Sequence, residues 1–331
     1  MKKTNLRAIV LNLTLILVLS LAFSACASPS GSSNNDAASH SASETESAGT
    51  YPLVFDNYGR EVVVTTKPQK VLTLGPNCTE LFIALGLADY IIGHSLRDHS
   101  RGPLPEYATE YEKIPELTYS HATREAVVAS SADFIYGIDW EFGDAALDID
   151  ELAGYGMTVY MNAAQTLEEQ YQEILDIGKI FDVEDVAEAF VADQKARIQA
   201  VQDKNAGKQP PNVLIYDHGS DGVFTASGIN FESLLVELAG GKNIFDDITD
   251  KAWITVSFEE VLARVPDVIL IHDYDAPSAQ EKIAEIKAND LFAQLDCVKN
   301  DRFIIIDLES ILPGSRMAYT VERLTAGYFS S

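Results

Sequence analysis

Cysteine is scarce in this chain of 331 residues, which contains only Cys26, Cys78 and Cys297. Cys26 directly follows an apolar leader, and the other two fall in different predicted halves of the chain. Small disulfide-stapled domains carry an even set of cysteines within a short sequence, so a disulfide framework is not indicated. Cys78 is best interpreted as a small hydrophobic residue.

Positive charge is also sparse, since 24 Lys and Arg residues face 50 Asp and Glu residues, for a net charge of −26. Residues 1–25 contain Lys2, Lys3 and Arg7 but no acid, so the chain without them has a net charge of −29. Such an acidic surface repels nucleic acid and anionic lipid headgroups. The composition therefore argues against a nucleic-acid partner.

Long apolar runs are confined to the N-terminus, where residues 8–23 are mostly apolar and follow three positive charges. This pattern predicts a secretory signal peptide over residues 1–25 rather than a membrane-spanning helix. The small residues Ser24 and Ala25 before Cys26 resemble a bacterial lipobox, although Phe23 stands where leucine is usual. We therefore expect an extracytoplasmic lipoprotein, held at the cell membrane by a diacylglycerol group on Cys26.

Residues 26–50 consist mainly of Ser, Ala, Asn and acidic residues, with almost nothing to bury. They are predicted to form a disordered tether. About 280 residues remain for folding, which is enough for two lobes with cores of their own.

Catalytic motifs are missing as well. The sequence contains no His-Glu-x-x-His motif, no nucleophile elbow and no glycine-rich phosphate loop. We therefore expect a protein that is not an enzyme and has no resident cofactor. The alternative from another class is an extracellular hydrolase built across a cleft, with Cys78 or Ser220 as nucleophile beside a histidine.

An internal repeat is the most informative feature that is present: TREAVVASSADFIYGIDW, residues 123–140, recurs 134 residues later as SFEEVLARVPDVILIHDY. Thr123 and Ser257 precede the two repeated glutamates by two residues, where a hydroxyl can cap a helix N-terminus. The apolar runs that follow are typical of strands covered on both faces. The identical pairs are Glu125 and Glu259, Val127 and Val261, Ala129 and Ala263, Asp133 and Asp267, Ile135 and Ile269, and Asp139 and Asp273.

Strand and helix signals alternate along the rest of the chain, which predicts an α/β fold with mainly parallel sheets. Asn77 and Glu80 are predicted to form a variant capping box at one helix start. The helix-rich stretch between the halves predicts a rigid connection. The predicted organisation is two Rossmann-like lobes, residues 51–182 and 207–331, joined by one long α-helix over residues 183–206, with a ligand cleft between them.

In parallel sheets, ligands bind beyond the carboxyl ends of the strands. Five of the six histidines stand at or near such ends, and the sixth, His40, lies in the tether. Aromatic faces and guanidinium groups suit a large, flat or polyanionic ligand. The candidate ligand-binding residues on this criterion are His94, Arg97, His99, Arg101, His121, Tyr136, Trp140, Tyr216, His218, His272 and Tyr274.

The chain resembles the ABC-importer substrate-binding proteins for ferric siderophores, haem and cobalamin. The resemblance is carried by DNYGREVVVTTKPQKVLTLGPNCTELFIALG, REAVVASSADFI, FTASGINFESLLVELAGGKNIF, WITVSFEEVLARVPDVIL and GSRMAYTVERL. It implies a monomer of two lobes with little domain closure. It also implies that Glu125 and Glu259 dock into arginines of a two-subunit or homodimeric permease. Ala132 departs from the family, which usually has proline there.

The same resemblance adds Phe224 and Trp253 as cleft aromatics and Arg316 as a basic ligand contact. The first hypothesis for the ligand is an iron complex, either a ferric siderophore or haem, with Tyr136, His218 and His272 as candidate haem ligands. An anionic chelate would require Arg97, Arg101 and Arg316 to reverse the local field.

Two further ligands remain open. A corrinoid needs no positive field, and a bare transition metal would use His94, His121, His218 and Asp273. The sequence does not indicate which metal complex is bound, which permease is the partner, or whether the host is Gram-positive or Gram-negative.

Overall fold

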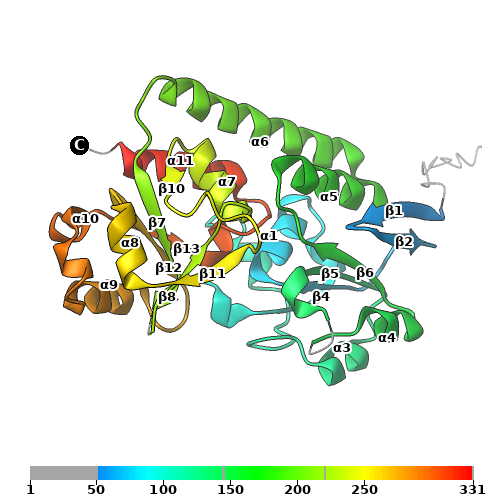
Figure 1. Cartoon of the computed structure of the whole chain (residues 1–331). Coiled ribbons are helices and arrows are strands. Elements are labelled where there is room, and N and C mark those ends of the chain that lie inside the picture. The colour runs from blue at the N-terminus through cyan, green and yellow to red at the C-terminus, as the bar shows by residue number, and fades with distance from the viewer. Residues whose placement is uncertain (1–50, 144–145, 220, 330–331) are drawn as a thin grey trace, which may run out of the picture. The chain divides into compact units, whose positions relative to one another are not determined.

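The computed structural model describes residues 51–143, 146–219 and 221–329. It shows two α/β lobes, each with a four-stranded parallel sheet (Figure 1), which confirms the predicted fold class. The predicted signal peptide, the tether with Cys26 and His40, and Ser220 lie outside the described residues.

The first lobe is built on a parallel sheet with the strand order β4-β3-β5-β6. All residues of β3 and β5 are buried, as expected for strands with helices on both faces. An antiparallel hairpin, β1 with β2, precedes the sheet. The elements are β1 (Leu53–Asn57), β2 (Arg60–Val64), β3 (Val71–Leu74), α1 (Pro76–Ala84), β4 (Ile91–Ser95), α2 (Ala108–Tyr111), α3 (Arg124–Ser130), β5 (Phe134–Ile138), α4 (Ile149–Gly154), β6 (Thr158–Asn162) and α5 (Leu167–Ile180).

One long helix, α6 (Glu184–Asn205), follows the first lobe and leads to the second (Figure 1). It packs against α5 and against the C-terminal helix α11 (Met317–Tyr328). Its bounds lie within the range 183–206 predicted for a linking helix. Because α6 is held by helices of both lobes, its packing adds to the stiffness expected of a helical connection.

The second lobe has the strand order β10-β7-β12-β13, again parallel. It also contains a three-stranded antiparallel sheet, β11-β9-β8, which the sequence analysis did not predict. The elements are β7 (Asn212–Tyr216), β8 (His218–Gly219), β9 (Val223–Ala226), α7 (Phe231–Leu238), β10 (Lys242–Asn243), β11 (Trp253–Val256), α8 (Phe258–Arg264), β12 (Val268–Asp273), α9 (Ala279–Ala288), α10 (Asp296–Lys299) and β13 (Phe303–Asp307).

The sequence repeat corresponds to a repeated structural unit. Helices α3 and α8 each contain seven residues and are capped by the hydroxyl groups of Thr123 and Ser257, as predicted. Both helices end in a left-handed residue, Ser131 in one and Val265 in the other. The unit α3–β5 of the first lobe therefore recurs as α8–β12 of the second.

The repeated aspartates have the same role in both lobes. Asp133 accepts hydrogen bonds from the backbone N–H groups of Gln69 and Lys70, just before β3. Asp267 accepts one from the N–H of Asn212, at the start of β7. Each carboxylate thus fixes the entry of the central strand, which explains why aspartate recurs before each apolar run.

The capping box predicted for Asn77 and Glu80 is wrong. The N-cap of α1 is Gly75, whose φ of 133° favours glycine, and no side chain caps this helix. Asn77 instead donates to the side chain of Asn162 and to the carbonyl of Pro313. The side chain of Asn77 therefore bonds to residues distant in sequence instead of capping α1.

Cys78 and Cys297 are both free and buried, one in each lobe. Burial raises the pKa of both thiols above the ordinary value. This result favours the interpretation of Cys78 as a hydrophobic residue and argues against a nucleophilic role. None of the helices in the described ranges is long and apolar enough to cross a bilayer.

Candidate functional site

A cavity of about 210 Å³ lies between the two lobes, at the carboxyl ends of β5 and β6. Trp140 lines it from the first lobe and Trp253 from the second, and these are the two tryptophans of the chain. Pro313, after β13, also contributes to the lining. The structure therefore brings two of the predicted aromatic residues to one interlobe site.

An aromatic ladder extends from this cavity along one face of the antiparallel sheet. Phe224 stacks on Trp253 with ring centroids 5.3 Å apart, and His218 stacks on Phe224 at 5.1 Å. His218 lies directly opposite Phe224 in the pairing of β8 with β9, which brings their side chains together on the same face. His218 is exposed and the other two are half-buried. We call His218, Phe224 and Trp253 the aromatic ladder.

A second aromatic group bridges the lobes. His99 of the first lobe stacks on Tyr274 of the second at 6.0 Å, and His121 meets His99 edge-on at 5.9 Å. Asp98 and Glu141 form hydrogen bonds with the Nδ1 atoms of His99 and His121. Although burial opposes it, hydrogen bonds from Ser120 and His99 lower the pKa of Asp98.

The three arginines proposed for an anionic ligand are already paired with carboxylates. Arg97 lies 3.5 Å from Glu116, and Arg101 lies 2.9 Å from Asp273. Arg316 pairs with Glu80 at 2.6 Å. The field of these three cations is therefore largely compensated within the protein.

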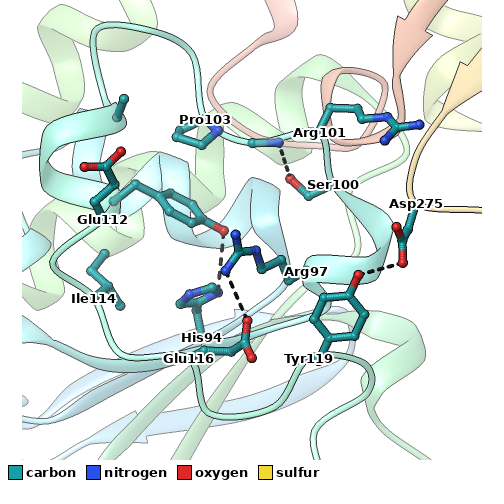
Figure 2. A pocket seen from close by; sticks show the side chains of 13 residues that line it. His94, Arg97, Ser100, Arg101, Pro103, Glu112, Ile114, Glu116, Tyr119 and Asp275 are labelled. Carbon is teal, nitrogen blue, oxygen red and sulfur yellow. Dashed lines mark hydrogen bonds and ion pairs between the residues drawn. The ribbon is translucent and has the colours of Figure 1, made fainter.

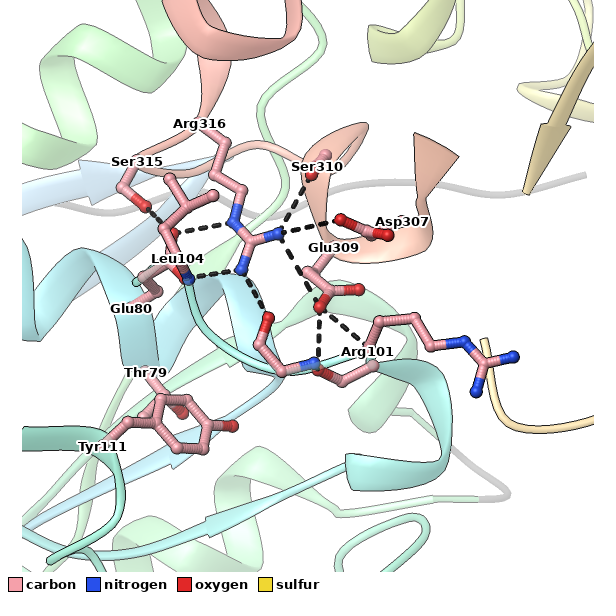
Figure 3. Close-up of polar contacts among 12 residues, drawn as sticks. Thr79, Glu80, Arg101, Leu104, Tyr111, Asp307, Glu309, Ser310, Ser315 and Arg316 are labelled. Carbon is pink, nitrogen blue, oxygen red and sulfur yellow. Dashed lines mark hydrogen bonds and ion pairs between the residues drawn. The ribbon is translucent and has the colours of Figure 1, made fainter. Parts of the chain in front are cut away.

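Arg316 is a correction to the sequence analysis, because it is 3% exposed and cannot meet a ligand in the cleft. Figure 3 shows its guanidinium group enclosed by polar partners. Its Nε and Nη2 atoms donate to the two carboxylate oxygens of Glu80, and Nη2 also donates to the carbonyl of Gly102. Its Nη1 atom donates to the hydroxyl of Ser310. Arg316 thus fastens the segment before α11 to the first lobe.

Three more candidates are buried within the lobes. Tyr136 is fully buried and donates to Glu173, and Tyr216 is 2% exposed in the core of the second lobe. His272 is fully buried between carboxylates. All three lie within strands rather than beyond them, so their side chains pack into the lobes. The hypothesis that Tyr136 and His272 ligate haem iron is not supported by this placement.

His94 and Arg97 line a different cavity, of about 630 Å³, formed mainly by the loops after β4 (Figure 2). His94 is 3% exposed, and burial lowers its pKa, which favours the neutral imidazole. Tyr119 at the edge of this cavity donates to Asp275 of the second lobe. These residues are not brought together with the tryptophan cavity.

No group of three or more His, Cys, Asp or Glu side chains suited to a metal ion occurs among the residues that the structure describes. His94, His121, His218 and Asp273, the candidates for a bare-metal site, therefore do not form such a group. Sequence reasoning also missed polar residues that line the tryptophan cavity, namely Asn162, Gln165 and Asn230. Asn162 ends β6, so the strand-end rule could have found it.

The two repeated glutamates are exposed. Glu125 and Glu259 lie in the first turns of α3 and α8, in different lobes (Figure 1). Neighbouring residues carry the ion pairs of these helices, with Arg124 bound to Glu151 and Arg264 bound to Glu260. Both carboxylates are thus accessible to a partner.

Comparison with known proteins gives a consistent result. A family model described as periplasmic binding protein matches residues 71–309. An ABC transporter substrate-binding lipoprotein of Bacillus subtilis (strain 168), YvrC, is 24% identical over 301 residues, covering 89% of this chain and 91% of the relative. A vitamin B12-binding protein of Vibrio campbellii is 26% identical over 218 residues, covering 66% of this chain and 74% of the relative.

Among solved structures, a periplasmic binding protein from Veillonella parvula superposes with a TM-score of 0.73 at 27% sequence identity. The match covers 83% of this chain and 96% of that protein. The matched region spans both lobes and the helix between them.

Proposed function

Because the chain belongs to the periplasmic binding protein family, we propose that it is the substrate-binding component of an ABC importer of the siderophore, haem and vitamin B12 type. The observation that carries the proposal is the cavity walled by Trp140 and Trp253 at the strand ends of two lobes. A site of this kind binds and releases a ligand, and the catalytic motifs are missing from the sequence.

The ligand class follows from the charges around the cleft. Arg97, Arg101 and Arg316 are compensated by carboxylates, so a polyanion finds no free cation among them. Aromatic rings and the exposed amide side chain of Gln165 remain available at the cavity, whereas the amides of Asn162 and Asn230 are buried and bonded to other parts of the protein. A corrinoid ring presents flat apolar faces and carboxamide side chains, which match rings and amides respectively. We therefore favour a corrinoid, the alternative ligand of the sequence analysis.

An uncharged ferric siderophore is the second candidate, because it also needs no guanidinium partner. Haem is less compatible, because its two carboxylates would find no free cation among Arg97, Arg101 and Arg316 and because Tyr136 and His272 are buried. The cavity of about 210 Å³ is smaller than either ligand, so we expect the ligand to extend over the aromatic ladder toward solvent.

A titration with three probes tests the ligand class. We expect cyanocobalamin to quench the tryptophan emission of the purified protein at micromolar concentration or below, an uncharged ferric trihydroxamate to bind more weakly, and haemin to bind weakest. The variant W253A should lose at least about 10-fold in affinity by calorimetry, since the lost stacking and the lost buried ring area together contribute about 1.4 kcal/mol or more. The control Y155A, at an exposed tyrosine outside the cavity, should bind normally. Tightest binding of haemin would contradict the ligand class.

Docking to the permease is proposed to use Glu125 and Glu259. The double variant E125K/E259K should abolish uptake while leaving ligand affinity unchanged, because exposed charge pairs set orientation and association rate. The control E188K changes an exposed glutamate of α6 and should transport normally. Weakened ligand binding in E125K/E259K would place these residues in the cleft instead.

Membrane attachment is proposed to depend on a lipid at Cys26, at an extracytoplasmic surface. The variant C26A should move the protein from the membrane fraction to the soluble fraction, because the lipid would be the anchor. Retention of C26A in the membrane fraction would contradict this proposal.

A further inference from the structure

Four charged side chains are buried beneath the aromatic ladder in the second lobe. They come from four elements: Asp217 after β7, Glu232 in α7, His272 in β12 and Lys282 in α9. The side chains of Glu232, His272 and Lys282 are fully buried, and that of Asp217 is 13% exposed. We call these four residues the buried charge cluster.

His272 is the centre of the cluster. Its Nε2 atom lies 2.8 Å from Oε1 of Glu232, and its Nδ1 atom lies 3.3 Å from Oδ1 of Asp217. Only the imidazolium form can donate from both nitrogens, so two facing carboxylates favour the charged ring. Burial opposes the charge, but Glu232 and Asp217 together raise the pKa of His272 to about 9.

Lys282 supplies the second positive charge. Its Nζ atom donates to the backbone carbonyl of His272 at 2.8 Å and lies 3.8 Å from Oδ1 of Asp217. Two cations thus balance two carboxylates. Beyond the cluster, the charges that act on Lys282 are Asp273, Arg101 and Glu285, of which Asp273 and Arg101 pair with each other.

Two aromatic residues of the cleft, Trp253 and Tyr274, contact His272 and Lys282. The ring of Trp253 meets that of His272 edge-to-face, with centroids 6.1 Å apart and an interplanar angle of 85°. The Nζ atom of Lys282 lies 3.7 Å from the centroid of the Tyr274 ring. Trp253 begins the aromatic ladder and Tyr274 stacks on His99 of the other lobe, so both aromatic groups of the site contact the cluster.

We propose that the buried charge cluster positions the aromatic wall of the cleft, with protonated His272 orienting Trp253 and Lys282 orienting Tyr274. Well-packed apolar residues would fill this space at no electrostatic cost, whereas four desolvated charges need a further role such as geometric specificity. The consequence for ligand binding rests on the proposed function, while the orientation of the rings does not.

The proposal makes the site sensitive to alkaline pH. A raised histidine pKa gives stabilisation that is complete below the ordinary value of about 6.5 and is lost as pH rises through about 9. Burial lowers the pKa of Lys282 to about 8, so Lys282 loses its charge first and its contact with Tyr274 weakens. Trp253 and Tyr274 therefore keep their cationic contacts at neutral pH and lose both of them between about pH 8 and pH 9.

Fluorescence of ligand-free protein tests the ring orientation. In the variant W140F all tryptophan emission comes from Trp253, and a contacting imidazolium quenches indole more strongly than neutral imidazole does. We expect emission to rise between pH 7 and pH 10 with a midpoint near 9. The step should vanish in W140F/H272Q and should move down by at least one pH unit in W140F/E232Q. The control W140F/H94Q, at a buried histidine of the other lobe, should keep the step.

A flat emission profile in W140F, or an unchanged step in W140F/H272Q, would overturn the proposal. H272Q removes a buried charge and can impair folding, so W140F/E232Q serves as a second test. A midpoint that does not move in W140F/E232Q would also contradict the proposed role of His272. For the ligand, H272Q should bind cyanocobalamin at least about 10-fold more weakly at pH 7. If the unmodified protein binds no cyanocobalamin, the corrinoid assignment fails, but the emission step still decides the role of the cluster.

Discussion

At the scale of single residues, Glu173 shows how burial and hydrogen bonding compete. Its carboxyl group accepts hydrogen bonds from the hydroxyl groups of Tyr58 and Tyr136, from the side chain of Asn162 and from the backbone N–H of Ala163. These donors favour the ionised form, but full burial dominates and raises the pKa of Glu173 to about 7. The folded protein therefore holds this proton at a pH where the unfolded chain has lost it.

The stability difference between the unmodified protein and E173Q should depend on pH. An acid with a raised pKa stabilises the fold below its unfolded pKa of about 4.5, and this contribution is lost as pH rises toward 7. The free energy of unfolding of the unmodified protein should therefore fall relative to E173Q by about 3 kcal/mol between pH 4.5 and pH 7.5. Urea unfolding across this range measures it. A flat difference, as expected for the exposed control E188Q, would contradict the assignment.

The strand-end rule succeeded for some residues and failed for others. Trp140 and Tyr274 follow the last residues of β5 and β12, and both lie at the interlobe region as predicted from sequence. Tyr136 and His272 lie inside those strands and are buried. A shift of two positions in one strand and of four in the other decides whether a residue lies at the cleft, and sequence alone does not fix strand ends so closely.

Arg316 could not be assigned from sequence for a different reason. Its main partner, Glu80, is 236 residues away along the chain. A lone arginine in a sequence is expected at the surface, and only the fold reveals that a buried carboxylate meets it.

At the scale of elements, the contact between α5 and α6 depends on a small residue. A Cβ atom added at Gly178 of α5 would lie 2.6 Å from Cβ of Ala187 in α6. The close approach of these two helices therefore requires glycine at position 178, and it helps to fix α6 against the first lobe.

The variant G178A should destabilise the protein by about 1–3 kcal/mol, because the added methyl group overpacks the helix contact. Adding A187G should recover part of the loss, since it removes the opposing atom. The control G154A lies at the end of α4 with no atom within 4 Å of the new Cβ and should be neutral or slightly stabilising. Thermal unfolding compares the three variants. Equal stability of G178A and G154A would show that the helices separate without cost.

Elements with strong local signals were predictable, and short ones were not. The hydroxyl caps of α3 and α8 follow directly from Thr123 and Ser257. The antiparallel sheet was missed because β8, β9 and β11 contain only two to four residues. Such short strands do not show a recognisable alternation of apolar and polar residues.

At the scale of the whole molecule, the two lobes are joined by more than α6. Ser315 and Arg316 of the segment before α11 both bind Glu80 in α1, and Glu309 accepts hydrogen bonds from Ser100 and from the backbone of Arg101. This buried polar junction is a second fixed connection between the lobes. It is consistent with the limited domain closure that the resemblance implied.

The variant R316M should lower the free energy of unfolding by about 3–5 kcal/mol, because it leaves the carboxylate of Glu80 buried without its cation. The control R97Q removes an exposed arginine with one long contact and should cost about 1 kcal/mol or less. Urea unfolding of both variants measures the difference. If R316M were no less stable than R97Q, the junction would not hold the lobes together.

The two buried cysteines have a practical consequence. Cys78 lies in α1 of the first lobe and Cys297 in α10 of the second, at 0% and 3% exposure. Each half of the protein thus contains one concealed thiol that an alkylating reagent can reach only when that half opens. Timed alkylation with peptide mass spectrometry would record the opening of each half separately, and an occupant held between the halves should slow both reactions.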